Sequence, residues 1–101
     1  MSEQNNQDQN PDIEISTKEP SFYNVFLLND DFTTQEFVVK VLTQFFYKSD
    51  SEAFKLMLEV HNNGRALVGT FTKEIAETKI YLVHQAAREN EFPLKCSMEE
   101  C

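Results

Sequence analysis

Asn29, Asp30 and Asp31 form a run of three polar side chains at the point where an apolar stretch ends. The stretch before them, Phe22 to Leu28, is expected to be a buried strand, and a helix is expected to start soon after them. Two adjacent carboxylates in such a place are costly unless a cation uses them. An ammonium group needs several acceptors around one point, and this run could provide them.

A second group of residues could complete a site of this kind. His61, near the end of a later expected helix, can accept a hydrogen bond when its ring is neutral. Val38, Met57 and Val60 belong to the apolar faces beside it and can adapt to a bound group. Together these residues would form a polar clamp next to an apolar slot.

Local structure offers a simpler explanation of the three polar residues. Asn and Asp favour turns, and acidic side chains near the start of a helix interact favourably with its dipole. Spacing alone therefore favours loop formation and helix capping over a binding site, and it leaves both interpretations open.

Few other side chains of this sequence could support catalysis. The candidates are Asp30, Asp31, His61, His84 and Cys96. We keep as the alternative function a small metal-dependent hydrolase that uses Asp30, Asp31 and His61, although no paired-His or paired-Cys motif accompanies them. A Cys–His nucleophile pair is conceivable, but an inert structural thiol is the simpler interpretation of Cys96. We therefore expect no catalytic residue, metal or cofactor.

The charge of the chain argues against several kinds of partner. The net charge is −8, and Lys and Arg are scattered singly, so we expect no binding to nucleic acid or to an anionic membrane. No apolar stretch approaches the roughly 20 residues of a membrane span, and the start of the chain lacks a signal-peptide pattern. Cys96 and Cys101 have neither a disulfide-framework nor a zinc-site spacing. These features predict a cytoplasmic protein, and the small size favours a monomer.

The composition divides the chain into two parts. Residues 1–20 are rich in Gln, Asn and acids, and we expect them to form a disordered N-terminal extension. Residues 21–101 are expected to form one domain with the element order βααβαβ. Its expected elements are the strand Phe22 to Leu28, the helices Thr34 to Tyr47 and Asp50 to His61, the strand Arg65 to Phe71, the helix Lys73 to Asn90 and the strand Leu94 to Met98. The order favours a two-layer α+β domain in which a three-stranded antiparallel sheet packs on three helices.

Several residues are expected to mark the helix ends. Thr33 with Glu36, and Ser49 with Glu52, have the spacing of a capping box. Gly64 is expected to end the second helix in the left-handed conformation. Thr72 is expected to cap the third helix.

Five stretches of the sequence form a recognisable set of motifs: Y-x-V-x-L-x-N-D-D-x-T at 23–33, EFV at 36–38, LMLEVHNNGRA at 56–66, G-x-F-T-K-E-I-A-E-T-K at 69–79 and ARENEFPLKC at 87–96. With these motifs the chain resembles the family of the Clp protease adaptor ClpS, which recognises bacterial N-degrons. The motifs cover nearly the whole expected domain in the order of the family, so residues 21–101 are interpreted as a ClpS-like adaptor domain.

The resemblance implies a function for this domain. Proteins of the family bind the first residue of a substrate chain and deliver the substrate to the ClpA unfoldase of the ClpAP protease. Asn29, Asp31 and His61 would bind the free α-amino group, and Asp30 would support their loop and the first peptide group. The pocket for a Leu, Phe, Tyr or Trp side chain would be lined by Thr33, Gln35, Val38, Met57, Val60 and Leu94.

The resemblance also implies a route to the protease. Glu74, Glu77 and Lys79 would dock on the N-terminal domain of ClpA. The extension at residues 1–20 would be the part that is fed toward the unfoldase, where it changes substrate choice.

Gln35 departs from the family pattern, in which many members have Met at this place. In the family that Met excludes β-branched first residues. Gln is similar in length but polar, so we expect weaker discrimination against Ile and Val here. Thr34 also replaces a common Pro, a change of little consequence in the first helical turn.

Overall fold

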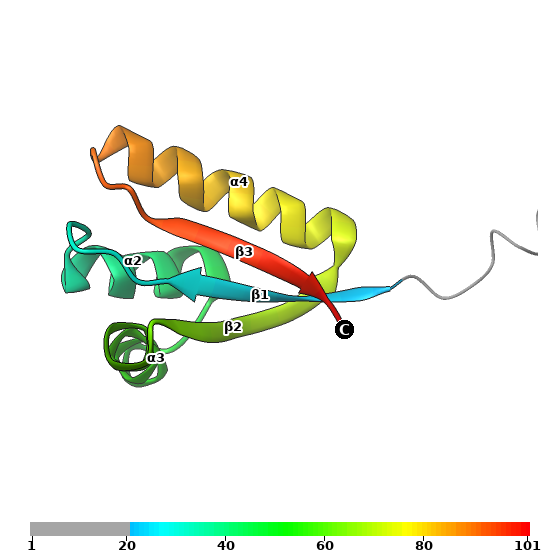
Figure 1. Ribbon diagram of the computed structural model, residues 1–101, viewed down its shortest axis with the longest axis horizontal. Coiled ribbons are helices and arrows are strands. Elements are labelled where there is room, and N and C mark those ends of the chain that lie inside the picture. The colour runs from blue at the N-terminus through cyan, green and yellow to red at the C-terminus, as the bar shows by residue number, and fades with distance from the viewer. Residues whose placement is uncertain (1–20) are drawn as a thin grey trace, which may run out of the picture.

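The computed structural model describes residues 21–101 (Figure 1). The expected disordered extension at residues 1–20 lies outside the described residues. The elements in chain order are β1 (Phe22–Leu28), α2 (Gln35–Phe46), α3 (Asp50–Asn63), β2 (Arg65–Thr72), α4 (Lys73–Glu89) and β3 (Lys95–Glu100). The βααβαβ order predicted from the sequence is confirmed.

The three strands form one antiparallel sheet with the order β2-β1-β3. The first strand of the chain is therefore the central one, and Leu28 at its end pairs with Arg65 on one side and Lys95 on the other. Helix α4 runs beside β3, α3 lies beside β2, and α2 contacts both helices (Figure 1). The predicted two-layer α+β fold is confirmed.

The core forms where one face of the sheet meets the helices. Val25 and Leu27 of β1 are fully buried, whereas Phe26 between them is only half-buried, as expected for a strand with one covered face. Helix α2 presents a stripe of buried residues to this face: Phe37, Val38, Val41, Leu42 and Phe46. Burial of this stripe against the sheet fixes the direction of α2 and therefore the place where the helix begins.

One predicted helix cap is wrong, and another has the predicted N-cap position but no side-chain hydrogen bond. Thr34, not Thr33, is the N-cap of α2, and its hydroxyl accepts a hydrogen bond from the Phe37 amide at 3.1 Å. Thr33 instead belongs to the turn before the helix, where its amide and its hydroxyl both donate to Asp30. Thr72 stands at the start of α4 but makes no side-chain cap bond, and it is also the last residue of β2, paired with Phe22.

The two caps predicted for α3 are confirmed. The Ser49 hydroxyl accepts from the Glu52 amide at 3.2 Å, and Gly64 ends the helix with a φ of 91°. Helix α3 runs two residues further than predicted, to Asn63. Within residues 21–101, no helix is both long and apolar enough to cross a membrane.

Candidate functional site

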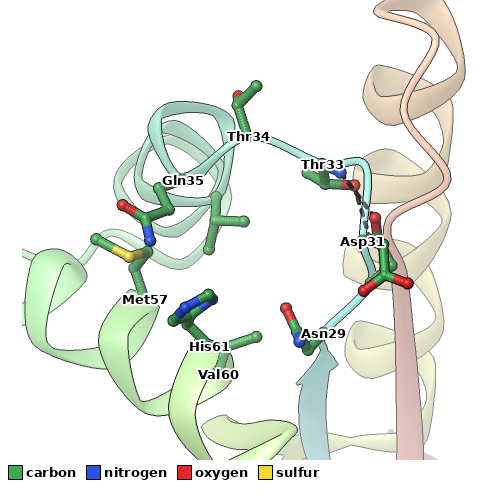
Figure 2. Close-up of a pocket in the computed structure, with 10 residues that line it drawn as sticks. Asn29, Asp31, Thr33, Thr34, Gln35, Met57, Val60 and His61 are labelled. Atoms are coloured by element: carbon green, nitrogen blue, oxygen red, sulfur yellow. Dashed lines mark hydrogen bonds between the residues drawn. The ribbon is translucent and has the colours of Figure 1, made fainter.

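A pocket of about 500 Å³ opens between the loop that follows β1, the start of α2 and the last turns of α3 (Figure 2). It is lined by Asn29, Asp30, Asp31, Thr33, Thr34, Gln35, Val38, Met57, Val60 and His61. The structure thus brings together the three residues expected to bind an amino group, the supporting Asp30, and all but one of the residues expected to line a side-chain slot. Thr34 is a lining residue that the sequence interpretation missed, because it was regarded only as part of the helix.

The loop after β1 owes its shape to Asp30. One carboxylate oxygen accepts from the amides of Phe32 and Thr33, at 2.8 and 2.7 Å, and the other accepts from the Thr33 hydroxyl at 2.7 Å. Partial burial alone would raise the pKa of Asp30, but the hydrogen bonds from Thr33 and Phe32 outweigh it and lower that pKa from its ordinary value. Asp30 is therefore a charged brace of the loop. It holds the exposed neighbours Asn29 and Asp31 at the mouth of the pocket.

A backbone hydrogen bond joins the two sides of the site. The Asn29 amide donates to the Gly64 carbonyl at 2.9 Å, and the Gly64 amide donates to Val60 at 2.9 Å. Because Gly64 adopts a positive φ, the chain can turn back from α3 into β2 beside the end of β1. This arrangement places Asn29 close to the last turns of α3, which carry Val60 and His61.

The pocket has a polar side and an apolar side. Asn29 and Asp31 lie opposite Gln35 and Met57 across the cavity, and the His61 ring lies between them along the α3 side (Figure 2). Val38, Met57 and Val60 are 2–6% exposed and form the apolar wall. Oxygen and nitrogen acceptors at one edge of an apolar slot suit a ligand that has a cationic group next to an apolar group.

Leu94 does not line this pocket. It is 3% exposed and belongs to the core, and it borders a separate hollow with His84 and Arg88 of α4. Leu94 precedes β3, which pairs with the far side of β1, so the sheet order separates it from the slot.

The structure gives little support to a catalytic interpretation. Within residues 21–101 no three His, Cys, Asp or Glu side chains are grouped so that they could hold a metal ion. Burial raises the pKa of the Cys96 thiol to about 12, which keeps it protonated near neutral pH. His84 is close to Cys96, but its Nε2 atom accepts from the Cys96 backbone amide at 2.9 Å rather than from the thiol.

The three residues expected to dock a partner have different surroundings. Glu74 and Glu77 are exposed on the first turns of α4. Lys79 is half-buried, and its Nζ atom donates to the carbonyl of Phe45 at 2.8 Å and lies 4.8 Å from the centre of the Tyr47 ring. Lys79 therefore ties α4 to the end of α2, where helix carbonyls lack helical partners.

The fold and the site together define a small α+β domain with a pocket that has a polar side and an apolar side. Comparison with known proteins gives the family. Residues 18–97 match the family model of the ATP-dependent Clp protease adaptor protein ClpS. The chain belongs to the ClpS family of Clp protease adaptors, as its motifs predicted.

Similar proteins cover most of the chain. The ATP-dependent Clp protease adapter protein ClpS of Desulfotalea psychrophila is 48% identical over 87 residues, which are 86% of this chain and 85% of that protein. The ClpS of Salmonella arizonae is 51% identical over 88% of this chain and 84% of its own length. A solved structure of Agrobacterium tumefaciens ClpS2 bound to L-phenylalaninamide has a TM-score of 0.80 and 37% identity, and the match covers 82% of this chain and all of the other. The D. psychrophila and S. arizonae proteins are both described as protease adapters, which indicates a non-catalytic role.

Proposed function

We propose that this protein binds the free α-amino group and the bulky hydrophobic first residue of N-degron substrates, namely Leu, Phe, Tyr or Trp, and delivers these substrates to the ClpA unfoldase of the ClpAP protease. The observation that carries the proposal is the pocket in which Asn29, Asp31 and His61 stand beside the apolar wall of Val38, Met57 and Val60. The A. tumefaciens relative bound to L-phenylalaninamide supports it, because that ligand joins an α-amino group to one aromatic side chain.

Each polar residue has a separate task in this proposal. The α-ammonium donates to the side chains of Asn29, Asp31 and His61, and neutral His61 supplies a lone pair. Asp30 does not need to touch the ligand, because its oxygens already hold the loop. Thr33 and Gln35 border the slot that receives the first side chain.

The expected affinity suits an adaptor that must release its cargo. Burial of one Phe or Leu side chain contributes roughly 1.5–3 kcal/mol. Two or three charge-assisted hydrogen bonds add roughly 1.5–3 kcal/mol each. After the cost of association, a micromolar complex near −8 kcal/mol is expected.

Delivery uses parts of the molecule away from the pocket. In this proposal residues 21–101 act as one adaptor domain, the exposed Glu74 and Glu77 of α4 meet the N-terminal domain of ClpA, and Lys79 holds α4 in place for that contact. Residues 1–20 are the extension that the unfoldase engages. One copy of the chain carries the whole pocket, so a monomer suffices.

A single substitution tests the binding half of the proposal. His61→Ala removes one acceptor of the ammonium, and we expect roughly 10- to 100-fold weaker binding of a Phe-led peptide, measured by fluorescence anisotropy. Asn62→Ala is the matched control, since Asn62 is the exposed neighbour of His61 and does not line the pocket. Equal affinities of the wild-type protein and His61→Ala would contradict the proposed clamp.

A further inference from the structure

A second hollow adjoins the candidate pocket and shares two of its walls. This groove of about 340 Å³ is lined by Gln35, Glu36, Val39, Phe54 and Met57, and Gln35 and Met57 also line the first pocket. The two hollows are therefore neighbours that have Gln35 and Met57 as common walls. Asn29, Asp31 and His61, the amino-group clamp of the proposed function, do not line the groove.

The groove is apolar in a place where solvent reaches it. Phe54 is 54% exposed, and Leu58, one turn further along α3, is 37% exposed. Val39 of α2 is half-buried and faces the same hollow. Single exposed apolar side chains are common, but a phenyl ring and a Val side chain that line one hollow beside a binding pocket favour an apolar occupant.

The arrangement of the first pocket gives the direction in which a bound chain would leave. Asn29 and Asp31 lie on one side of the cavity, and Gln35 and Met57 lie on the opposite side (Figure 2). We take the chain to continue across the cavity from the ammonium on the first side, which carries its carbonyl end toward Gln35 and Met57 (Figure 2). The chain then crosses these two residues and meets the groove.

Chain geometry selects the residue that would occupy the groove. In an extended chain successive side chains point to opposite faces, and each residue advances the chain by about 3.3 Å. The third side chain therefore points the same way as the first and lies about 7 Å further along. The second side chain points away from the surface.

We infer that the groove beside Phe54 is a subsite for an apolar side chain at the third position of the same substrate chain whose first residue fills the pocket. This inference rests on the proposed function, because it needs the first residue in the slot. It adds a preference that the first residue alone does not set: Phe-led chains with Leu, Ile or Phe at the third position bind more tightly than chains with Ser there.

The test measures three peptides that differ only at two positions, by fluorescence anisotropy against the full chain. They begin Phe-Ser-Leu, Phe-Leu-Ser and Phe-Ser-Ser and are otherwise identical. We expect the first to bind about fivefold more tightly than the third, which corresponds to about 1 kcal/mol, and the second to bind like the third. Equal affinities of all three, or a gain from Leu at the second position only, would overturn the inference.

Substitution at the groove checks that the preference arises there. In Phe54→Ser the fivefold preference for Leu at the third position is expected to fall below about twofold, while in Tyr81→Ser it is retained. Tyr81 is a suitable control because it is 60% exposed and lies on α4, away from both hollows. A preference that survives in Phe54→Ser would also overturn the inference.

Binding of L-phenylalaninamide separates the two proposals. This ligand has no third residue, so its affinity is expected to be the same for the wild-type protein and Phe54→Ser. If L-phenylalaninamide fails to bind the wild-type protein, the proposed function itself is wrong. If it binds and the peptide series shows no preference, only the subsite is wrong.

Discussion

Both carboxylate oxygens of Asp30 accept hydrogen bonds from its own loop, whereas Asp31 next to it is exposed at the mouth of the pocket. Adjacent residues of the same type therefore have different roles, and the difference comes from the turn that Asp30 makes with Thr33. Removal of Asp30 is expected to act through the shape of the loop. Removal of Asp31 is expected to act on the bound ammonium alone.

The role of Asp30 predicts a specific dependence of stability on pH. Its pKa is lower in the folded protein than its ordinary value of 3.8, so its stabilising effect is complete above pH 3.8 and is lost as the pH falls through the folded pKa. Asp30→Asn replaces hydrogen bonds to a charged group by neutral ones, and we expect a loss of about 1 kcal/mol in the free energy of unfolding at pH 7. Urea unfolding of both proteins from pH 7 to pH 3 checks this. The difference between them should shrink below pH 3.8, and a difference that grows there would contradict the assigned role.

Gln35 is the residue at which specificity is expected to depart from the family pattern. It lies beside Met57 at the edge of the slot (Figure 2), and its polar side chain is exposed. We expect Gln35→Met to increase the preference for a Leu-led over an Ile-led peptide by about fivefold, because a Met side chain at the edge of the slot would crowd the methyl group on the β-carbon of Ile, which Leu lacks. Affinities of the two peptides for both proteins give the ratio. An unchanged ratio would show that Gln35 does not control the first residue.

At the scale of elements, the site depends on the contact between the end of β1 and the end of α3. The Asn29 amide and the Gly64 carbonyl close this contact, and the positive φ of Gly64 permits the turn. Two elements far apart in the sequence thereby place the amino-group clamp and the apolar wall at a fixed distance. In the proposed function, the clamp and the apolar wall can then hold the first residue of a substrate chain at the same time.

Helix α4 allows the docking part of the proposal to be tested apart from binding. Glu77→Lys reverses an exposed charge, so we expect peptide affinity to remain within twofold while ClpAP degrades a Phe-led reporter at least fivefold more slowly. Degradation at the wild-type rate would contradict the assignment of Glu77. A charge reversal at Lys79 is a poor substitute for this experiment. It would also remove the hydrogen bond from Lys79 to the Phe45 carbonyl and so loosen the packing of α4.

The elements could be predicted from the sequence because their signals are local. The spacing of apolar residues predicted the helices and strands, and the family motifs predicted which residues line the pocket. The start of α2 was misplaced by one residue because Thr33 belongs to the turn that it makes with Asp30, and Thr34 is the cap. The positions of Leu94 and Lys79 depend on the sheet order and on a contact between helices, which no local pattern reveals.

At the scale of the whole molecule, residues 21–101 present one small domain with its candidate pocket at one end of the sheet and the exposed acids of α4 elsewhere on its surface. The pocket is formed by backbone turns and buried side chains, so the protein needs little rearrangement to bind the first residue of a chain. The binding free energy then depends mainly on the groups that the ligand supplies. The proposed function therefore requires both parts of the ligand: the ammonium for the polar side and the first side chain for the apolar wall.

The requirement for a free ammonium is the central claim, and acetylation tests it most directly. Two fluorescent peptides with Phe as the first residue and an identical remaining sequence are compared by anisotropy, one with a free α-amino group and one acetylated. Acetylation removes the charge and two of the three N–H donors and leaves the phenyl ring unchanged. We expect micromolar binding of the free peptide and at least 100-fold weaker binding of the acetylated one. Equal affinities would contradict the account.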